Sequence, residues 1–314
     1  MKNLDILTLG GNAILPAGAT GTIEEQLAVT RTAMGHVADL LCKGRRVVLT
    51  HGNGPIVGNI VLRNEAARDI VAPMPLDVCG ADSQGGIGYM IQQTLGNVLA
   101  ERGVKRDVVA LVTQVCVDEN DPAFSNPVKP IGPYFDEKQA NEIAGERGWK
   151  FTEADNGKCR RVVASPAPID VVEKNVIRQL VELDVVVITV GGGGVPVVNI
   201  DGKYSGRDAV IDKDLASSLL ARDIGAERFF ILTDVDAVYR NFGSDSPEPL
   251  REVTVGEVSR LHEEGHFPPG SMGSKIQAAI EFLKGGGQKV IISDPSNLAA
   301  AAEGRAGTTI VPGE

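Results

Sequence analysis

The chain has 314 residues, of which 43% are hydrophobic and 23% charged, a composition typical of a globular protein with one large domain or two ordinary ones. The net charge of −10 argues against a nucleic-acid-binding protein, which would present a basic face to phosphates. No run approaches the roughly 20 apolar residues that span a bilayer, no signal-peptide pattern opens the chain, and four scattered cysteines show no metal-site spacing. We therefore expect a cytoplasmic protein with reduced thiols and no membrane partner.

Short apolar runs alternate with helical-period segments in the first part of the chain, a pattern typical of βα units around a mostly parallel sheet. Apolar residues spaced three or four apart between Ile23 and Lys43 predict an amphipathic helix that ends at Gly44. Pro55 suits the first turn of another helix. The predicted strands are 4–9, 46–50 and 107–117, and the predicted helices are 23–43, 56–68 and 86–102.

Residues 118–165 differ in character from the rest. They hold many prolines and charges, the single tryptophan and few long apolar runs, so we expect a small lobe or lid that leaves the sheet. The βα pattern then resumes. The predicted helices are 169–183, 211–223 and 271–284, and the predicted strands are 185–190, 228–233 and 289–293. The strand 185–190 is apolar on both faces, as expected for a central parallel strand.

Glycine-rich turns follow three of the predicted strands, at 10–13, 52–54 and 191–194. Ligands of open α/β sheets bind beyond the carboxyl ends of the strands, where glycines expose backbone N–H groups to a phosphate. One such turn is also typical of a tight βα connection, whereas two at neighbouring strands can enclose both sides of a transferring phosphoryl group. Four consecutive glycines indicate close approach of the backbone to a ligand. His51 could serve as a base, but an ionised acceptor oxygen needs none, so we favour a structural role.

Three lysines stand in turns marked by glycine, proline or acidic residues: Lys129, Lys213 and Lys275. Phosphoryl transfer needs charge stabilisation and positioning more than covalent chemistry, and ammonium groups supply the charge. Taken singly, each could be an ordinary surface or first-turn lysine. Lys213, however, sits at the positive end of a helix, where a cation is unfavourable, and two flanking carboxylates that direct it toward a phosphate would explain its position. The three together predict a phosphotransferase that acts on a small anion. P-loop, dinucleotide and protein-kinase motifs are absent from the sequence.

These motifs together resemble the carbamate kinases of the amino-acid-kinase family. The Lys129-Pro-Ile-Gly-Pro133 loop and the Met74-Pro-Leu-Asp77 segment distinguish this branch from acetylglutamate, glutamate and uridylate kinases. The matching segments run in family order from residue 4 to about residue 311, and they are 9–13, 50–55, 74–79, 83–89, 126–133, 191–196, 209–214, 231–236 and 265–272.

The resemblance implies one amino-acid-kinase domain over residues 1–314, with a protruding subdomain at about 118–165. It implies a three-layer αβα sandwich with a mainly parallel central sheet of about eight strands and a small protruding lobe, usually in a homodimer. The implied reaction is reversible phosphoryl transfer between ATP and carbamate, giving ADP and carbamoyl phosphate, used for ATP synthesis in nitrogen or arginine catabolism. Mg²⁺ would accompany ATP or ADP, held mainly by the nucleotide phosphates and water rather than by a protein metal site.

The resemblance also implies roles for individual residues. Lys129, Lys213 and Lys275 would neutralise the transferring group, and Asp214 would hold the lysines in place. Substrate and phosphoryl contacts would come from Gly10, Gly11, Asn12, Gly52, Asn53 and Gly54. Nucleotide contacts would come from Gly192, Gly193, Thr233, Asp234, Val235, Tyr239, Ser271, Met272 and Lys275.

The chain departs from the family pattern in the lobe. Cys159 stands where the family carries an aromatic residue, and Ala164 where it carries proline; the nucleotide loop also varies at Gly273-Ser274. Two alternatives therefore stay open: a related kinase for another small carboxylate or carbamate-like acceptor, and a non-catalytic sensor of nucleotide or carbamoyl phosphate. Retention of all three lysines favours an enzyme, because a sensor could lose at least one.

Overall fold

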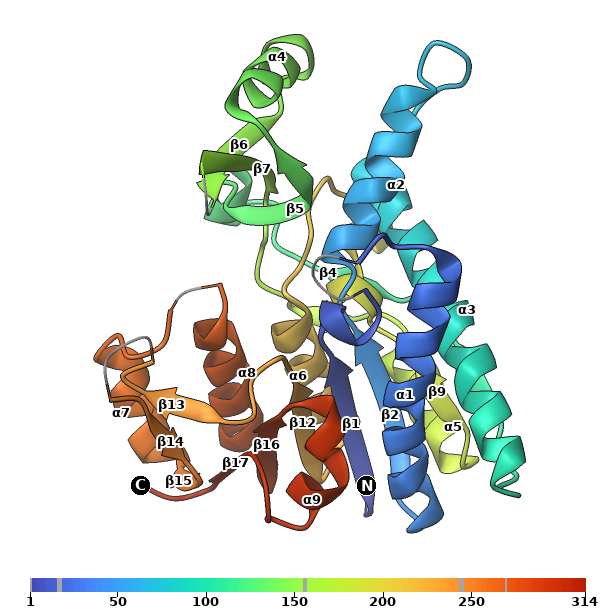
Figure 1. The fold of residues 1–314 in the computed structure, drawn as a ribbon, viewed down its shortest axis with the longest axis vertical. Helices are drawn as coiled ribbons and strands as arrows, with labels where there is room; N and C mark the ends of the chain where they lie inside the picture. The colour runs from blue at the N-terminus through green and yellow to red at the C-terminus, as the bar shows by residue number, and fades with distance from the viewer. Residues whose placement is uncertain (1, 16–18, 155–156, 243–245, 269) are drawn as a thin grey trace.

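The fold is built around a central eight-stranded sheet (Figure 1). The computed structural model describes residues 2–15, 19–154, 157–242, 246–268 and 270–314. Adjacent strands of this sheet run parallel except for one antiparallel pair, β16 (Lys289–Ser293) with β17 (Thr308–Val311). The order across the sheet is β15 (Glu252–Thr254), β17, β16, β12 (Arg228–Leu232), β1 (Leu4–Leu9), β2 (Arg46–His51), β9 (Val186–Ile188) and β3 (Val108–Ala110).

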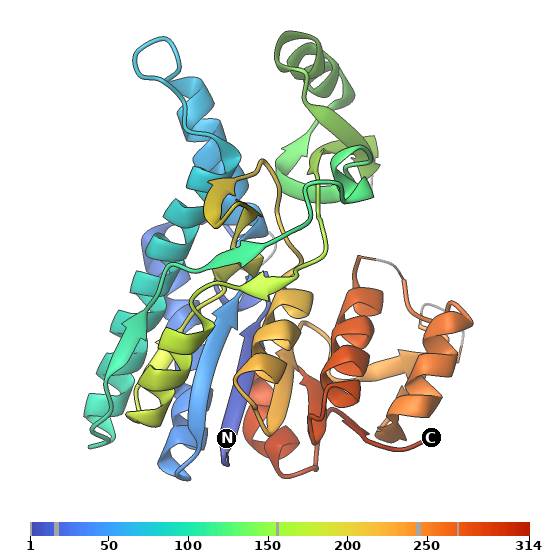
Figure 2. The same cartoon turned by 180° about the vertical axis from the view of Figure 1, so that it is seen from behind.

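Helices cover both faces of the sheet and form two separate hydrophobic cores. Alternation of side chains along β1 sends Leu4 and Ile6 into one core and Leu7 and Leu9 into the other. One face carries α1 (Ile23–Cys42), α3 (Leu76–Glu101) and α9 (Leu298–Ala302); the other, seen in Figure 2, carries α5 (Lys174–Glu182), α6 (Lys213–Asp223), α7 (Val255–Glu263) and α8 (Met272–Lys284). The three-layer sandwich with a mainly parallel sheet, predicted from the sequence, is confirmed.

The remaining strands form three small sheets. An antiparallel pair, β13 (Val238–Arg240) with β14 (Glu248–Leu250), lies beside α7 (Figure 1). A four-stranded sheet has the order β11 (Lys203–Gly206), β10 (Val195–Ile200), β4 (Gln114–Cys116) and β8 (Asp170–Val171). The lobe consists of α4 (Glu137–Arg147) and a three-stranded antiparallel sheet of β5 (Lys129–Phe135), β7 (Lys158–Val163) and β6 (Lys150–Ala154).

The lobe stands above the carboxyl edge of the central sheet and leans on α2 (Gly54–Ala66) (Figures 1 and 2). Its buried Ile131 and Val163 share a small core with Val57 and Val61 of α2. None of the helices in the described ranges combines the length and apolarity needed to cross a membrane.

Three predicted elements differ from the structure. The predicted strand 107–117 is two strands in different sheets, because the side chain of Gln84 bonds both the N–H and the carbonyl of Thr113 and turns the chain away between them. The predicted helix 86–102 begins ten residues earlier, at Leu76 directly after Pro75; the glycines of this stretch have low helix propensity and concealed it. The predicted helix 169–183 begins only at Lys174, after the short strand β8.

Candidate active site

Two glycine turns lie next to each other at the carboxyl edge of the sheet. The strands β1, β2 and β12 are parallel neighbours, so their ends meet at the same edge. The N–H of Gly10 donates to the Leu232 carbonyl at 3.0 Å, and the N–H of Gly52 donates to the Leu9 carbonyl at 3.0 Å. Strand pairing therefore continues into both turns and fixes them side by side.

Helix α6 begins at this edge and presents two of the predicted catalytic residues. Asp212 caps the helix by accepting hydrogen bonds from the N–H groups of Asp214 (2.9 Å) and Leu215 (3.4 Å). The Asp214 side chain is only 2% exposed. It accepts from Lys213 Nζ at 2.6 Å and from Lys275 Nζ, on α8, at 3.2 Å. One buried carboxylate thus holds two lysines from different helices.

Lys129 reaches the same place from the lobe. Its Nζ donates to Asp212 Oδ2 at 2.7 Å. The expectation that two carboxylates hold Lys213 is wrong in detail, because the bonds of Lys213 Nζ go to Asp214 and to Thr8 Oγ1 at 3.4 Å. Asp212 instead binds Lys129, since its other oxygen is occupied by the start of the helix.

Burial and charge set the protonation of this cluster. Burial is the main reason that the pKa of Lys213 lies below its usual value; Asp214 opposes this effect and Lys275 adds to it. Burial alone would raise the pKa of Asp214, but the two ammonium groups hold it well below its usual range. Burial also opposes protonation of Lys275, yet Asp214 raises the pKa of this lysine above its usual value. Asp214 therefore stays ionised at neutral pH and keeps both lysines in place.

The cluster lines a cavity of about 180 Å³ between the glycine turns and the lobe. Formally, three ammonium groups face two carboxylates there, so the cavity favours an anion. Among the residues assigned to the substrate from the sequence, Gly10 does not line it, and the side chain of Asn12 lies outside the described part of the structure. Of the residues assigned to the nucleotide, Gly192 and Lys275 line this cavity, and Gly193 lines neither this one nor its neighbour. The lining residues are Gly11, Gly52, Asn53, Gly54, Pro55, Lys129, Pro130, Ile131, Gly192, Val210, Ile211, Asp212, Lys213, Asp214, Gly270, Ser274 and Lys275.

Sequence reasoning missed several of these residues. From the sequence, Asp212 is expected only to cap the helix or to flank Lys213; its pair with Lys129 lies 83 residues away and has no local signal. Thr8 carried no such signal, because a threonine inside an apolar strand is common. Its contact with Lys213 spans 205 residues of chain.

Close packing explains why glycine is needed in the turn at 191–194. A Cβ atom on Gly191 would lie 2.4 Å from His51 Nε2, and one on Gly192 would lie 2.0 Å from Asn53 Nδ2. On Gly193, the same atom would lie 2.3 Å from the Ile211 carbonyl oxygen. The turn is thus pressed between the second glycine turn and the start of α6, and only Gly192 reaches the cavity.

His51 is buried behind this turn, with 1% of its surface exposed, and does not line the cavity. Its Nδ1 lies 3.1 Å from the Gly52 carbonyl oxygen. Burial lowers the pKa of His51 from 6.5 to about 4, so the ring is neutral at pH 7. This position agrees with the structural role favoured from the sequence.

A second cavity, of about 80 Å³, adjoins the first and contains most of the predicted nucleotide contacts. Lys275 lines both cavities. Tyr239 donates its hydroxyl to Asp236 at 2.9 Å, and Met272 packs against the core beneath. The residues around this cavity are Thr233, Asp234, Val235, Ala237, Tyr239, Phe242, His266, Phe267, Pro268, Ser271, Met272 and Lys275.

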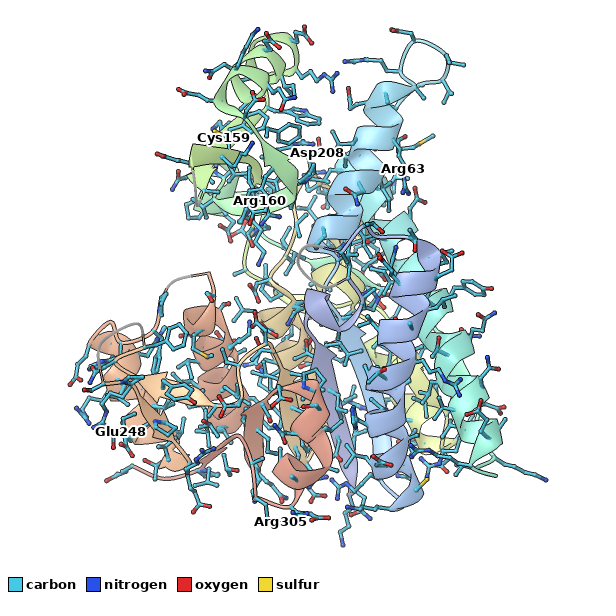
Figure 3. All side chains as sticks on the ribbon, in the orientation of Figure 1. Arg63, Cys159, Arg160, Asp208, Glu248 and Arg305 are labelled. Carbon is cyan, nitrogen blue, oxygen red and sulfur yellow. The ribbon has the colours of Figure 1, made fainter. Side chains whose placement is uncertain are left out.

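Of the departures in the lobe, Cys159 and Ala164 line neither cavity, although Ala164 bonds Val210, which lines the first. Cys159 is on β7, opposite Glu153 and Phe135 in the lobe sheet, and is labelled in Figure 3. Asp155 and Asn156, within the departing segment, lie outside the described residues. Ala164 is buried, and its carbonyl accepts from the Val210 N–H at 2.9 Å, so it ties the return of the lobe to the chain before α6.

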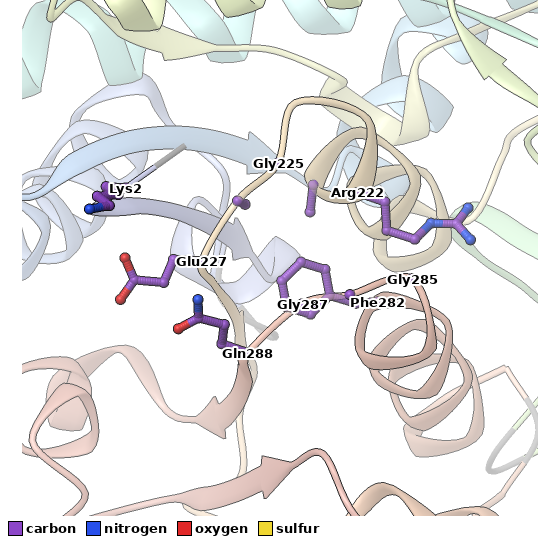
Figure 4. A pocket seen from close by; sticks show the side chains of 11 residues that line it. Lys2, Arg222, Gly225, Glu227, Phe282, Gly285, Gly287 and Gln288 are labelled. Carbon is purple, nitrogen blue, oxygen red and sulfur yellow. The ribbon is translucent and has the colours of Figure 1, made fainter.

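A further cavity of about 390 Å³ lies at the opposite end of the strands, where Lys2 and Glu227 precede β1 and β12 (Figure 4). Arg222 and the glycines at 285–287 also line it. In the close-up, the guanidinium of Arg222 points away from the space between Phe282 and Gly225. This cavity lacks the convergent lysines and glycine turns of the carboxyl edge.

Within the described ranges, no group of three or more His, Cys, Asp or Glu side chains could hold a metal ion. The two carboxylates of the site are already engaged by lysines. A divalent ion in this cavity would therefore rely on ligands that the substrate brings, as Mg²⁺ commonly does with nucleotide phosphates.

An open α/β sheet with lysines converging on glycine turns at its carboxyl edge defines the class of small-molecule phosphotransferases. The chain belongs to the amino acid kinase family, whose sequence model matches residues 5–294. It is 46% identical over 309 residues to a carbamate kinase of Pyrococcus furiosus, covering 98% of both chains. The resemblance to carbamate kinases that the sequence predicted is confirmed.

Solved structures agree in fold over the whole chain. The carbamate kinase of Giardia lamblia bound to citric acid superposes with a TM-score of 0.94 at 40% identity, covering 99% of each chain. The same enzyme bound to AMP-PNP gives a TM-score of 0.92 at 41% identity, again covering 99% of each chain.

Proposed function

We propose that this protein catalyses reversible phosphoryl transfer between ATP and carbamate. The observation that carries the proposal is the cluster of Lys129, Lys213 and Lys275 around a cavity walled by two glycine turns. Three cations in a largely buried space match the charge that spreads over a transferring phosphoryl group. Relatives over 98% of the chain that are carbamate kinases support carbamate as the acceptor.

In the direction that forms carbamoyl phosphate, a carbamate oxygen attacks the γ-phosphorus of ATP. A new P–O bond forms to carbamate, the bond between the γ-phosphorus and the β,γ-bridging oxygen breaks, and ADP leaves with that electron pair. The reverse reaction transfers the phosphoryl group from carbamoyl phosphate to ADP. The carbamate oxygen is already ionised, so the reaction needs no general base, and the buried neutral His51 is not required as one.

The lysines have distinct positions in this scheme. Lys275 lines both cavities, so it would bridge the nucleotide phosphates and the transferring group. Lys213 stands beside Gly52, whose added Cβ would lie 3.2 Å from Lys213 Cδ, so it would face the phosphoryl group at the glycine turns. Lys129 would reach the transferring group from the lobe, exchanging its contact with Asp212 for the substrate. Asp214 would stay bound to its two lysines throughout.

The turns complete the enclosure. The N–H groups of Gly11 and Gly54, with the amide of Asn53, would contact the carbamate and phosphoryl oxygens, while Thr233 and Tyr239 would border the base of the nucleotide. Mg²⁺ on the phosphates of ATP or ADP would neutralise part of their charge.

The proposal also covers the oligomeric state of the enzyme, its location and the direction of its reaction. We expect a homodimer in the cytoplasm, where ATP is available and where the four free cysteines stay reduced. We further propose that the reaction runs toward ATP in nitrogen or arginine catabolism.

The test is ATP formation from ADP and carbamoyl phosphate, with and without Mg²⁺. We expect ATP synthesis that depends on Mg²⁺ and that falls about 100- to 1,000-fold in Lys213→Met. If ADP binds by calorimetry but no ATP forms, acetyl phosphate and other acyl phosphates should be tried as donors. Synthesis with one of those would indicate a kinase for another carboxylate, whereas binding without any turnover would indicate a sensor.

A further inference from the structure

The lobe touches the body of the protein through a direct contact between two glycines. Gly58 lies on α2 and Gly132 on β5. A Cβ atom on Gly58 would lie 1.9 Å from Gly132 Cα and 2.3 Å from Gly132 N, distances at which the backbone itself must move. Gly132 also has φ +72°, in the left-handed region that disfavours a side chain. Gly58 therefore has no room for a side chain, whereas at Gly132 it is the left-handed backbone that favours glycine.

Contacts around the two glycines fix Gly132 within the lobe and hold the lobe against α2. Within the lobe, Arg160 of β7 donates from Nε (3.2 Å) and Nη2 (2.9 Å) to the Gly132 carbonyl oxygen, and Figure 3 labels this arginine. Arg147 of the lobe pairs with Glu65 of α2 at 3.4 Å. The space left between lobe and helix is only about 10 Å³, about the minimum for one water molecule. The interface is thus filled and leaves little freedom for the lobe to shift.

This contact lies between two walls of the active site. Lys129 begins β5 and is three residues from Gly132, roughly 10 Å along an extended strand. Gly54 and Pro55, which line the cavity, stand at the start of α2, about 6 Å along the helix from Gly58. A displacement at the glycine contact would therefore move Lys129 relative to the second glycine turn.

We propose that Gly58 and Gly132 are positioning residues for phosphoryl transfer: their backbone contact sets the distance of the lobe from the body and so places the Lys129 ammonium over the transferring group. The role assigned to Lys129 here rests on the proposed function. The glycines touch no substrate and act only through that lysine.

The chain contains its own probe of the contact. Trp149 is the single tryptophan, and it lies in the lobe against the core shared with α2. Arg161 stacks over its ring at 3.8 Å from the centroid. A lobe displaced from α2 would expose this ring to water, so its emission would shift to longer wavelength and acrylamide would quench it more strongly.

The first experiment compares Gly58→Ala with Gly145→Ala. Gly145 lies on the lobe helix α4, and a Cβ there meets no atom within 4 Å. For Gly58→Ala we expect a red-shifted Trp149 emission, a kcat lower by about 100-fold, as a misplacement of roughly 1 Å can cause, and an unchanged KM for ADP. Gly145→Ala should match the unsubstituted protein in all three. Wild-type emission and wild-type kcat in Gly58→Ala would overturn the proposal.

The second experiment asks whether the glycine acts through the lysine. If it does, the double variant Gly58→Ala/Lys129→Ala should turn over no more slowly than Lys129→Ala alone. Two losses that multiply would show that Gly58 matters for another reason and would refute the proposal. Should Gly58→Ala fail to fold, Glu65→Ala removes the pair between α2 and Arg147 of the lobe without a clash. We then expect a smaller loss of kcat and an emission shift in the same direction. Wild-type kcat together with wild-type emission would count against the proposal.

The two proposals fail in different ways. If the unsubstituted protein makes no ATP from carbamoyl phosphate, the proposed function is wrong. The emission and quenching of Trp149 still report the docking of the lobe in that case, because they need no turnover.

Discussion

At the scale of single residues, charge that is buried and paired defines the site. Asp214 is almost fully buried and is matched by two lysines, which is the condition under which a buried carboxylate stays ionised. In the proposed reaction, this arrangement would fix the lysines before substrate arrives, so that little reorganisation is needed during transfer. The two lysine side chains are equally exposed, at 16% each. Burial nevertheless lowers the pKa of Lys213, whereas Asp214 raises the pKa of Lys275.

The first prediction concerns Lys213→Met, which keeps the length of the side chain and removes its charge. We expect kcat for ATP synthesis to fall about 100- to 1,000-fold, because one stabilising donor of the transition state is lost. ADP binding measured by calorimetry should persist. Lys203→Met, at an exposed lysine of β11, is the matched control and should behave like the unsubstituted protein. Unchanged turnover in Lys213→Met would remove this lysine from the mechanism.

The second prediction concerns pH and His51. Its pKa is about 4 in the folded protein against 6.5 for the free side chain, so the unfolded chain binds more protons between these values. Stability should therefore rise with pH through this window and fall as the pH drops from 6.5 toward 4, on the order of 3 kcal/mol in total. Urea unfolding at a series of pH values would measure the slope.

The control for that experiment is His51→Gln, which cannot titrate in this range. Its free energy of unfolding should vary less with pH between 4 and 6.5 than that of the unsubstituted protein. Parallel curves for the two proteins would mean that His51 does not carry this dependence.

At the scale of elements, the site is built where strands end and helices begin. Parallel pairing of β1 and β2 places their glycine turns together, and the cap of α6 presents Lys213 and Asp214 toward those turns. The glycines at 191–194 let a third turn pass within contact distance of the second. Small residues are therefore required where three connections meet, whether or not a ligand touches each of them.

The third prediction distinguishes two reasons why a glycine substitution destabilises the protein: a steric clash of the new side chain and strain in the backbone. Gly192 and Gly202 both have positive φ, at +66° and +80°. A Cβ on Gly202 meets nothing within 4 Å, whereas one on Gly192 meets the Asn53 side chain at 2.0 Å. Gly202→Ala should cost roughly 1–2 kcal/mol of unfolding free energy, from the left-handed backbone alone. Gly192→Ala should cost clearly more in urea unfolding, and equal losses would contradict the packing explanation.

At the scale of the whole molecule, the two ends of the sheet have separate tasks. The carboxyl edge holds the lysine cluster, while the amino edge holds a buried ionic group of different composition. Asp5 is 0% exposed. It accepts from Arg45 Nε at 2.9 Å and from Arg228 Nε at 2.8 Å. This group ties β1 to both of its neighbouring segments and lies far along the strands from the site.

The fourth prediction follows from this separation. Asp5→Ala removes the carboxylate shared by two largely buried guanidinium groups. Arg45 keeps Glu227 at 3.7 Å and Arg228 keeps the Ala302 carbonyl at 3.2 Å, so the loss should be about 3 kcal/mol of unfolding free energy, the lower end for a broken buried pair. Its kcat should stay unchanged at temperatures where the variant is folded. Glu101→Ala breaks an exposed pair with Arg31, whose side chains are 53% and 55% exposed, and should cost about 1 kcal/mol or less. A large loss of kcat in folded Asp5→Ala would show that the two ends are coupled.

The sequence by itself determined the elements whose signals are local. Periodicity placed the helix that begins at Ile23, and apolar runs placed the strands that precede the glycine turns. Lysines beside glycine, proline or acidic residues indicated the phosphoryl chemistry before any geometry was known. These features lie within a few residues of one another, so the sequence displays them directly.

Only the tertiary structure decided which groups pair across the chain. Lys129 binds Asp212, 83 residues away, rather than leaving both acidic neighbours to Lys213. The turn at Thr113 depends on Gln84, and the need for glycine at position 58 depends on Gly132. Such contacts bring together segments distant in sequence, and neither partner carries a local pattern that identifies the other. Their geometry follows from the packing of whole elements, which is why it emerges only in the folded molecule.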